Sequence, residues 1–113
     1  MLILRQKEGN VNEKKLEDLL LQIGITPNLK GFAYIFDMVE LIDADQNRER
    51  NMLDMYTEVA KGNRTSRGAV ERGIRHAISR VDKESEAWRK YIGTKNATNA
   101  VVLCMLAYRL KED

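Results

Sequence analysis

Cysteine, histidine and proline each occur once in this chain of 113 residues, and each scarcity excludes a class of protein. The lone Cys104 cannot form an intramolecular disulfide. Together with the lone His76 it supplies too few ligands for a zinc site and no nucleophile with an adjacent base. The sequence therefore predicts no catalytic residue, no metal ligand and no cofactor, and a protein that is not an enzyme. The unpaired cysteine also favours a reducing, cytoplasmic location.

Long apolar segments are absent as well. The longest, AVVLCMLAY at residues 100–108, is about half the length of a bilayer-spanning helix, and the N-terminal MLIL is shorter than the apolar region of a signal peptide. We therefore expect no membrane attachment. Within the apolar run, Cys104 is expected to be buried as a small hydrophobic side chain.

What the chain does contain is helical periodicity along its length. With 43% hydrophobic and 32% charged residues it has the composition of a globular domain, and no stretch alternates as a half-buried strand does. We predict an all-α fold, a compact bundle of about six helices in a single domain at residues 1–113. The expected helices span about 12–23, 28–42, 48–61, 66–81, 84–91 and 98–111.

Local signals define the ends and buried faces of these helices. Asn12 is a good N-cap and Thr65 or Ser66 is another. The third helix should end at Gly62-Asn63, residues that tolerate left-handed backbone angles. The polar segment DADQNRERN at 43–51 predicts a loop without the central glycine and final glutamate of a calcium-binding loop. Apolar spacing predicts the core side chains, with Trp88 and Tyr91 as packing residues: Leu16, Leu19, Leu20, Ile23, Phe32, Ile35, Phe36, Val39, Ile42, Met52, Met55, Tyr56, Val59, Val70, Ile74, Ala77, Ile78 and Val81.

Positive charge is concentrated in residues 61–80, KGNRTSRGAVERGIRHAISR. This segment has a formal charge of +5, whereas residues 1–60 have −4 and residues 81–113 have +1. The short connection GNRT joins the basic helix to the helix before it, as in a helix-turn-helix. We therefore expect a helix-turn-helix at about 48–81, with its second helix at about 66–81.

At about 100° per residue, this basic helix has two distinct faces. Gly73 lies at the border of the buried face, where it allows close approach of the preceding helix. Arginine can chelate guanine O6 and N7 in the major groove, and glutamate can accept from cytosine N4. A solvated helix with an ordinary Glu71–Arg75 pair remains the simpler interpretation at this point. The outward face carries small and polar residues: Gly68, Glu71, Arg72, Arg75, His76 and Ser79.

Three segments resemble a known family in order and spacing: IGITPNLKGFAYI (23–35), EVAKGNRTSRGAVERGIRHAI (58–78) and KNATNAVVLCMLAYRL (95–110). They are similar to the C-terminal effector domain of stage-zero sporulation protein A, the response regulator of sporulation. The resemblance implies a bundle of about six helices with a helix-turn-helix that binds double-stranded DNA and regulates transcription. It also implies that Glu71 and Arg72 face bases and that Lys30 lies near the DNA backbone.

The residue pattern and the resemblance together give a set of candidate DNA-binding residues. The candidates that face bases are Arg67, Glu71, Arg72 and Arg75. The candidates that hold phosphates lie at the rim and at the helix ends: Lys30, Lys61, Arg64, Thr65, Ser66, His76 and Ser79.

The chain departs from the family pattern at several places. Ala69 stands where family members carry an arginine that reads a guanine, Gly68 replaces a serine, and Arg67 is a candidate to compensate. The chain has no room for the receiver domain, so we expect a stand-alone effector domain. Residues 82–98 are shorter than the family region that contacts the RNA polymerase sigma factor.

These departures keep a second function open. The chain can instead be a protein-interaction module that has lost operator recognition and binds a sigma factor or a full-length regulator. Pairing of two copies on DNA is a further expectation, because two-fold operators imply two-fold protein pairing.

Overall fold

The computed structural model describes residues 12–45 and 49–112, and the regular elements in these ranges are all helical. This confirms the predicted all-α bundle. The MLIL segment and residues 46–48 of the predicted loop lie outside the described residues. The helices are α2 (Glu13–Ile23), α3 (Lys30–Ala44), α4 (Met52–Gly62), α5 (Arg67–Ser79), α6 (Glu86–Tyr91) and α7 (Asn99–Leu110).

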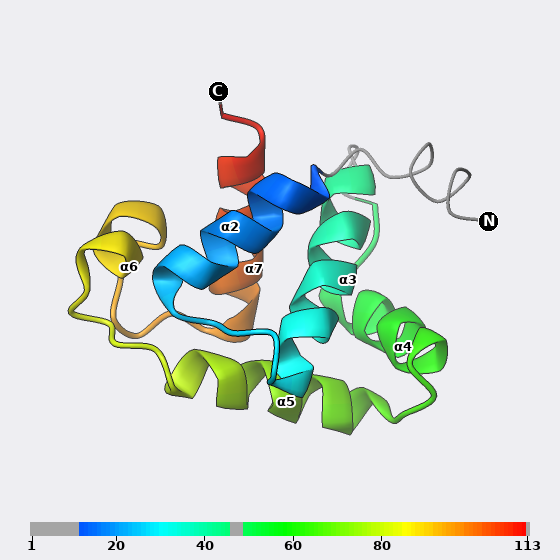
Figure 1. The fold of residues 1–113 in the computed structure, drawn as a ribbon. Coiled ribbons are helices and arrows are strands. Elements are labelled where there is room, and N and C mark those ends of the chain that lie inside the picture. Colours follow the sequence, from blue (N-terminus) through cyan, green and yellow to red (C-terminus); the bar gives the residue numbers. More distant parts are fainter. Residues whose placement is uncertain (1–11, 46–48, 113) are drawn as a thin grey trace.

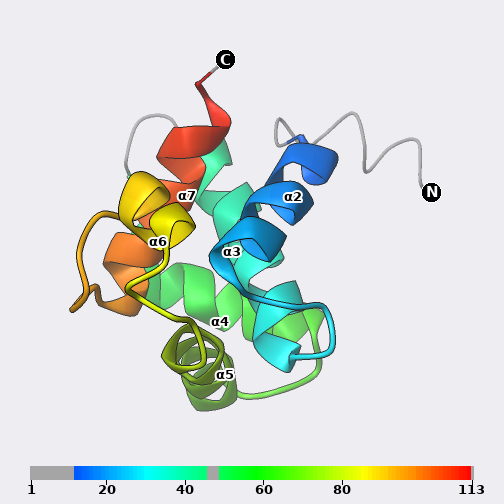
Figure 2. The same ribbon diagram turned by 60° about the vertical axis from the view of Figure 1, so that its left-hand side comes forward.

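Helix α5 lies across one end of the molecule. Helix α3 runs through the middle and packs against α4, α5 and α7. In Figure 1, α5 forms the lower edge, with α4 beside its first turns and α6 beyond its last. After a turn of 60° it is still the lowest helix (Figure 2). One long side of α5 therefore points away from the rest of the bundle.

Side-chain caps set the starts of most helices. The predicted Asn12 accepts from the Lys15 amide at 3.1 Å, and Ser66 rather than Thr65 caps α5. Helix α4 starts at Met52, later than predicted, because the Asn51 side chain accepts from the Asp54 amide at 2.8 Å. These bonds satisfy amides that would otherwise have no partner in the first turn.

The predicted loop at 43–51 is wrong at its beginning. Asp43 and Ala44 are the last residues of α3, and Asp43 is buried with its carboxylate 4.0 Å from the Lys111 ammonium. The turn begins at Asp45, whose two carboxylate oxygens accept from the backbone amides of Glu49 and Arg50 at 3.0 and 2.9 Å. A charged residue can end a helix inside the protein when it has such partners.

The predicted core is confirmed on α2 and α5 and shifted on α3. All the expected apolar residues of α2 and α5, with Val81 just after α5, are buried, and so are Met55, Tyr56 and Val59 of α4 and Trp88 of α6. On α3, Tyr34 and Met38 are buried, while Phe32, Phe36 and Ile42 are only partly covered. Because three other helices pack against α3, its buried face is wider than one stripe.

Cys104 is exposed, so the predicted burial is wrong. Helix α7 buries Val102, Leu103, Leu106 and Ala107 against the bundle. Cys104 falls on the other side, since three- and four-residue spacing places it with Val101 and Tyr108, which are also exposed. An apolar run on a helix does not by itself say which of its members face inward.

Candidate nucleic-acid interface

The exposed side chains of α5 gather along its free side. Arg72, Arg75, His76 and Ser79 are all exposed, whereas Val70 and Ile74 are fully buried. We call the four exposed residues the outer face of α5. Figures 1 and 2 both show the lower side of α5 without a neighbouring helix. The outer face is therefore open to a large ligand.

The two arginines of the outer face are free of carboxylates. Among residues 12–45 and 49–112, neither Arg72 nor Arg75 is within an ion-pairing distance of an acid. The expected Glu71–Arg75 pair is not formed. Glu71 instead lies 3.6 Å from Arg67, and the Glu71 and Arg67 side chains are 31% and 51% exposed. A solvent-accessible pair of this kind contributes only a few tenths of a kcal/mol, so a ligand can displace it at little cost.

Arg72 folds back over the first turn of α5. Its guanidinium is so placed that a Cβ at Gly68 would be 3.1 Å from one terminal nitrogen. The missing side chain at Gly68 therefore leaves room for the Arg72 fork. In this position the fork stays close to the first turn of the helix.

A groove borders α5 on the side of α7. Its volume is about 650 Å³, and Glu71, Arg75 and Ser79 line it together with Tyr56, Lys83 and residues 97–100. The side-chain amide of Asn99 donates to the backbone carbonyl of Glu71 at 3.1 Å. Burial raises the pKa of Tyr56 above 10.0, against the effect of its hydrogen bond with Asn99. Glu71 and Arg75 thus line a polar groove, and Arg75 also belongs to the outer face.

Sequence reasoning did not identify Tyr56 or Asn99 as part of this region. Tyr56 was predicted only as a core residue, and Asn99 was not singled out. A polar residue directly after the cap Thr98 was the available signal. It could not be interpreted without knowing that α7 starts beside α5.

The turn between α4 and α5 contains a strained residue. Helix α4 ends at Gly62 with Asn63 as its C-cap, as predicted, and the left-handed φ of +56° belongs to the next residue, Arg64. The Thr65 amide bonds the Ala60 carbonyl at 3.0 Å and the Arg64 amide bonds the Lys61 carbonyl at 3.3 Å. These two bonds form a Schellman motif, which normally has glycine at the left-handed position. They expose Lys61 and Arg64 beside the first turn of α5.

Ser66 and Thr65 have different surroundings at the same turn. The Ser66 hydroxyl accepts from the Ala69 amide at 3.1 Å, and Thr65 is partly buried. At the other end of α5, the Ser79 hydroxyl donates to the His76 carbonyl at 2.6 Å. These hydroxyls therefore already have local partners, and each retains further hydrogen-bonding capacity.

Lys30 reaches the same end of the molecule through a close helix crossing. A Cβ on Gly31 would meet the Gly73 carbonyl and lie 2.8 Å from the Ala77 Cβ, and a Cβ on Gly73 would lie 2.8 Å from the Tyr34 ring. The helix that approaches Gly73 is thus α3. The prediction that the preceding helix approaches it is wrong. This crossing places the exposed Lys30, at the start of α3, beside the middle of α5.

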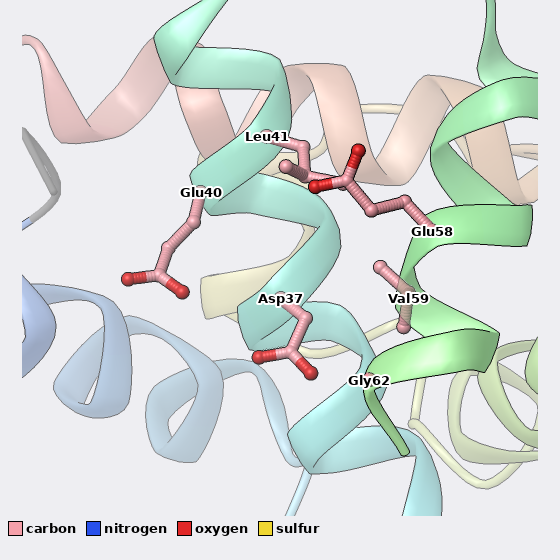
Figure 3. Close-up of a pocket in the computed structure, with 6 residues that line it drawn as sticks. All are labelled: Asp37, Glu40, Leu41, Glu58, Val59 and Gly62. Carbon is pink, nitrogen blue, oxygen red and sulfur yellow. The ribbon is translucent and has the colours of Figure 1, made fainter. Parts of the chain in front are cut away.

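An acidic pocket lies elsewhere, between α3 and α4. Its volume is about 270 Å³, and Figure 3 shows Asp37 and Glu40 on one wall and Glu58 on the other. Asp37 accepts from the Asn63 amide at 2.9 Å, and Glu58 pairs with Arg50 at 2.5 Å. The described residues contain no cluster of three or more potential metal ligands. Its negative charge makes this pocket unsuitable for a phosphate.

A family model described as "Sporulation initiation factor Spo0A C terminal" matches residues 16–110. The match includes all six described helices except the first residues of α2, and therefore the whole of α5 and the groove. None of the helices in the described ranges is long and apolar enough to cross a membrane.

Proposed function

Because the chain belongs to the family of Spo0A C-terminal domains, we propose that it binds double-stranded DNA of a defined sequence and regulates transcription. The family consists of DNA-binding effector domains of sporulation initiation and is not an enzyme family. In this proposal α4, the turn and α5, at about 48–81, form a helix-turn-helix, and α5 enters the major groove. The setting is the cytoplasm, where the DNA is.

The observation that carries this proposal is the pair Arg72 and Arg75 on the open side of α5. Both guanidiniums are exposed and have no carboxylate partner among the described residues. The major groove is about 12 Å wide and admits a helix with such side chains. Arg67 and Glu71 extend the base-facing set once their exposed pair opens.

Phosphate contacts come from residues around α5. They position the domain on the duplex and carry no sequence information directly. Lys30 lies beside the middle of α5. The other phosphate-contacting residues lie at the two ends of α5, in the turn before it and in its last residues. In this proposal the phosphate-contacting residues are Lys30, Lys61, Arg64, Thr65, Ser66, His76 and Ser79.

Ala69 changes the expected target. It lies next to Gly68 in the first turn of α5, so the family's guanine-reading arginine is missing there. One bidentate contact between arginine and guanine is worth about 1 to 3 kcal/mol of discrimination. We therefore propose that this protein prefers a site that differs from the usual family box at that base pair.

Selection of bound duplexes from a random pool, followed by titration at several salt concentrations, tests the proposal. With about four to five phosphates neutralised, the logarithm of the association constant should fall with the logarithm of salt concentration with a slope of about −4. Lys30→Ala should weaken binding to all duplexes equally and make the slope less steep by about 1. Failure to enrich any sequence, or binding that hardly responds to salt, would contradict the proposal.

A second candidate function is a protein-interaction module, and the exposed apolar side chains favour it. Val101 and Tyr108 lie on the free side of α7 at 42% and 58% exposure, and Leu53 of α4 is 51% exposed. Such side chains mark interaction surfaces when they are contiguous. This alternative would be supported if no duplex were retarded at low salt and the protein bound purified sigma factor.

Pairing of two copies on DNA would be detected by the stoichiometry of the titration.

A further inference from the structure

Asn99 links α7 to α5 at the edge of the proposed interface. It is the first residue of α7 and is only partly exposed. Its side-chain amide donates to the Glu71 carbonyl of α5 at 3.1 Å, across 28 positions of sequence. The groove that Asn99 lines is also lined by Tyr56, which belongs to α4 and is 7% exposed.

The bond to Glu71 has an unusual acceptor. The Glu71 carbonyl lies in the interior of α5, where it also serves the helix itself. Asn99 therefore contacts the backbone of α5 rather than a side chain that can rotate away. A contact to the backbone constrains the position of the whole helix.

A second contact constrains α5 from the other side. Gly73 packs directly against α3, where even a methyl group would overlap the Tyr34 ring. At about 100° per residue, positions 71 and 73 lie about 160° apart around the helix, on nearly opposite sides. Two attachments on opposite sides fix the rotation of a helix about its axis, which one attachment does not.

We propose that Asn99 is a positioning residue that holds α5 at the rotation at which Glu71 and Arg75 can meet bases. This rests on the proposed DNA-binding function. Asn99 itself need not touch DNA. Without its amide, α5 would remain packed on α3, but its outer face could turn relative to the groove walls.

Asn99→Asp separates positioning from folding. Aspartate cannot donate to the Glu71 carbonyl, but a negative charge in the first turn of α7 is favourable for the helix. Asn96→Asp is the matched control, because it makes the same change three residues earlier, in the connection that leads into α7. Asn96 is exposed and forms no side-chain hydrogen bond in the part of the chain that the structure describes.

The measured quantity is the ratio of affinities for the selected duplex and for duplexes with one base pair changed. We expect Asn99→Asp to lower this ratio by about fivefold at the pairs that Glu71 and Arg75 read, while its salt slope equals that of Asn96→Asp. A purely structural role would weaken binding to all duplexes alike and leave the ratio unchanged. That result would overturn the inference.

Two further outcomes are decisive. If Asn99→Asp does not fold, Asn99→Ala is measured in the same way, and failure of both to fold means that the residue is structural and the inference is wrong. If the unaltered protein discriminates between no duplexes, the proposed function fails first, and this is seen before any variant is made. Retained discrimination in a folded Asn99 variant rejects only the positioning role.

Discussion

Arg64 is the one described residue other than glycine with a left-handed backbone, and it stands in the turn that orients α5. A side chain in this conformation costs about 1 kcal/mol relative to glycine. Strain of this kind is retained where the side chain has a function. A phosphate contact beside the first turn of α5 is a function that would account for it.

Arg64→Gly should therefore separate stability from binding. We expect the free energy of unfolding to rise by about 1 kcal/mol, because glycine adopts the same turn without strain. DNA affinity should fall equally for all sequences, with the salt slope reduced by about 1. Urea unfolding and salt-dependent titration measure the two effects. Loss of stability together with unchanged affinity would show that Arg64 serves the fold alone.

The pKa of Tyr56 provides a test of its burial beside the groove. Burial raises its pKa above 10.0, so the folded state keeps the hydroxyl protonated at a pH at which the unfolded chain loses the proton. The contribution to stability is therefore complete below pH 10 and is lost as the pH rises through the folded value. We expect the free energy of unfolding to fall above pH 10, by at most about 1.4 kcal/mol per pH unit from this group.

Tyr56→Phe is the comparison for that pH dependence. Phenylalanine keeps the ring in the core and has no proton to lose, so the variant should show a weaker decline in stability above pH 10. Urea unfolding at a series of alkaline pH values measures this. Identical declines in the two proteins would mean that Tyr56 is solvated in the folded state.

Individual residues were the hardest to predict from the sequence. Asn12 and Ser66 were identified as caps because such side chains bond amides only a few positions away. The predicted burial of Cys104 was wrong because exposure depends on what packs nearby, and the left-handed backbone of Arg64 was not anticipated. Gly62 and Asn63 both tolerate a left-handed backbone. The amides of Arg64 and Thr65 bond carbonyls of the last turn of α4, however, and this places the left-handed residue at Arg64.

At the scale of elements, the crossing of α3 and α5 is the contact that places the outer face of α5. Gly31 and Gly73 bring the two backbones together at a point where neither helix can carry a side chain. The sequence showed that Gly73 borders a buried face, but not which helix would meet it. Contacts between helices distant in sequence have no local signal.

Gly73→Ala should destabilise the protein, since the new methyl group would overlap the Tyr34 ring. We expect a loss of about 1 to 3 kcal/mol, as for other overpacked sites. Gly62→Ala is the matched control, because nothing lies within 4 Å of a Cβ at this helical position. That variant should gain about 0.5 to 1 kcal/mol. Equal effects of the two changes on urea unfolding would contradict the close crossing.

Helix number and approximate position were predictable from the spacing of apolar residues, and every expected helix is present in the described ranges. The ends were less predictable. Helix α3 runs through Ala44 because the buried Asp43 has a partner in Lys111, which is far away in sequence. The predicted loop used only the local composition.

Across the whole molecule, the charge asymmetry of the sequence becomes a spatial one. Arg72 and Arg75 lie on the outer face of α5, while Asp37, Glu40 and Glu58 line a pocket between α3 and α4 (Figure 3). Charges arranged in this way steer a polyanion to one side and repel it from another. The net charge of +2 alone would not have indicated this.

Only part of the candidate site could be predicted from the sequence. The helix that carries Arg72 and Arg75 could be identified from charge and period, since both are properties of a continuous segment. The groove with Tyr56 and Asn99 could not, because it is formed by α4, α5 and α7 together.

Replacing guanine by 7-deazaguanine in the selected duplex tests whether Arg72 reads a base edge in the major groove. This change removes only the N7 acceptor of the major groove. We predict that the unaltered protein loses about fivefold or more in affinity at one guanine, and that Arg72→Ala, already weakened there, loses nothing further. Equal affinity of the unaltered protein for both duplexes, at every guanine of the site, would contradict the account.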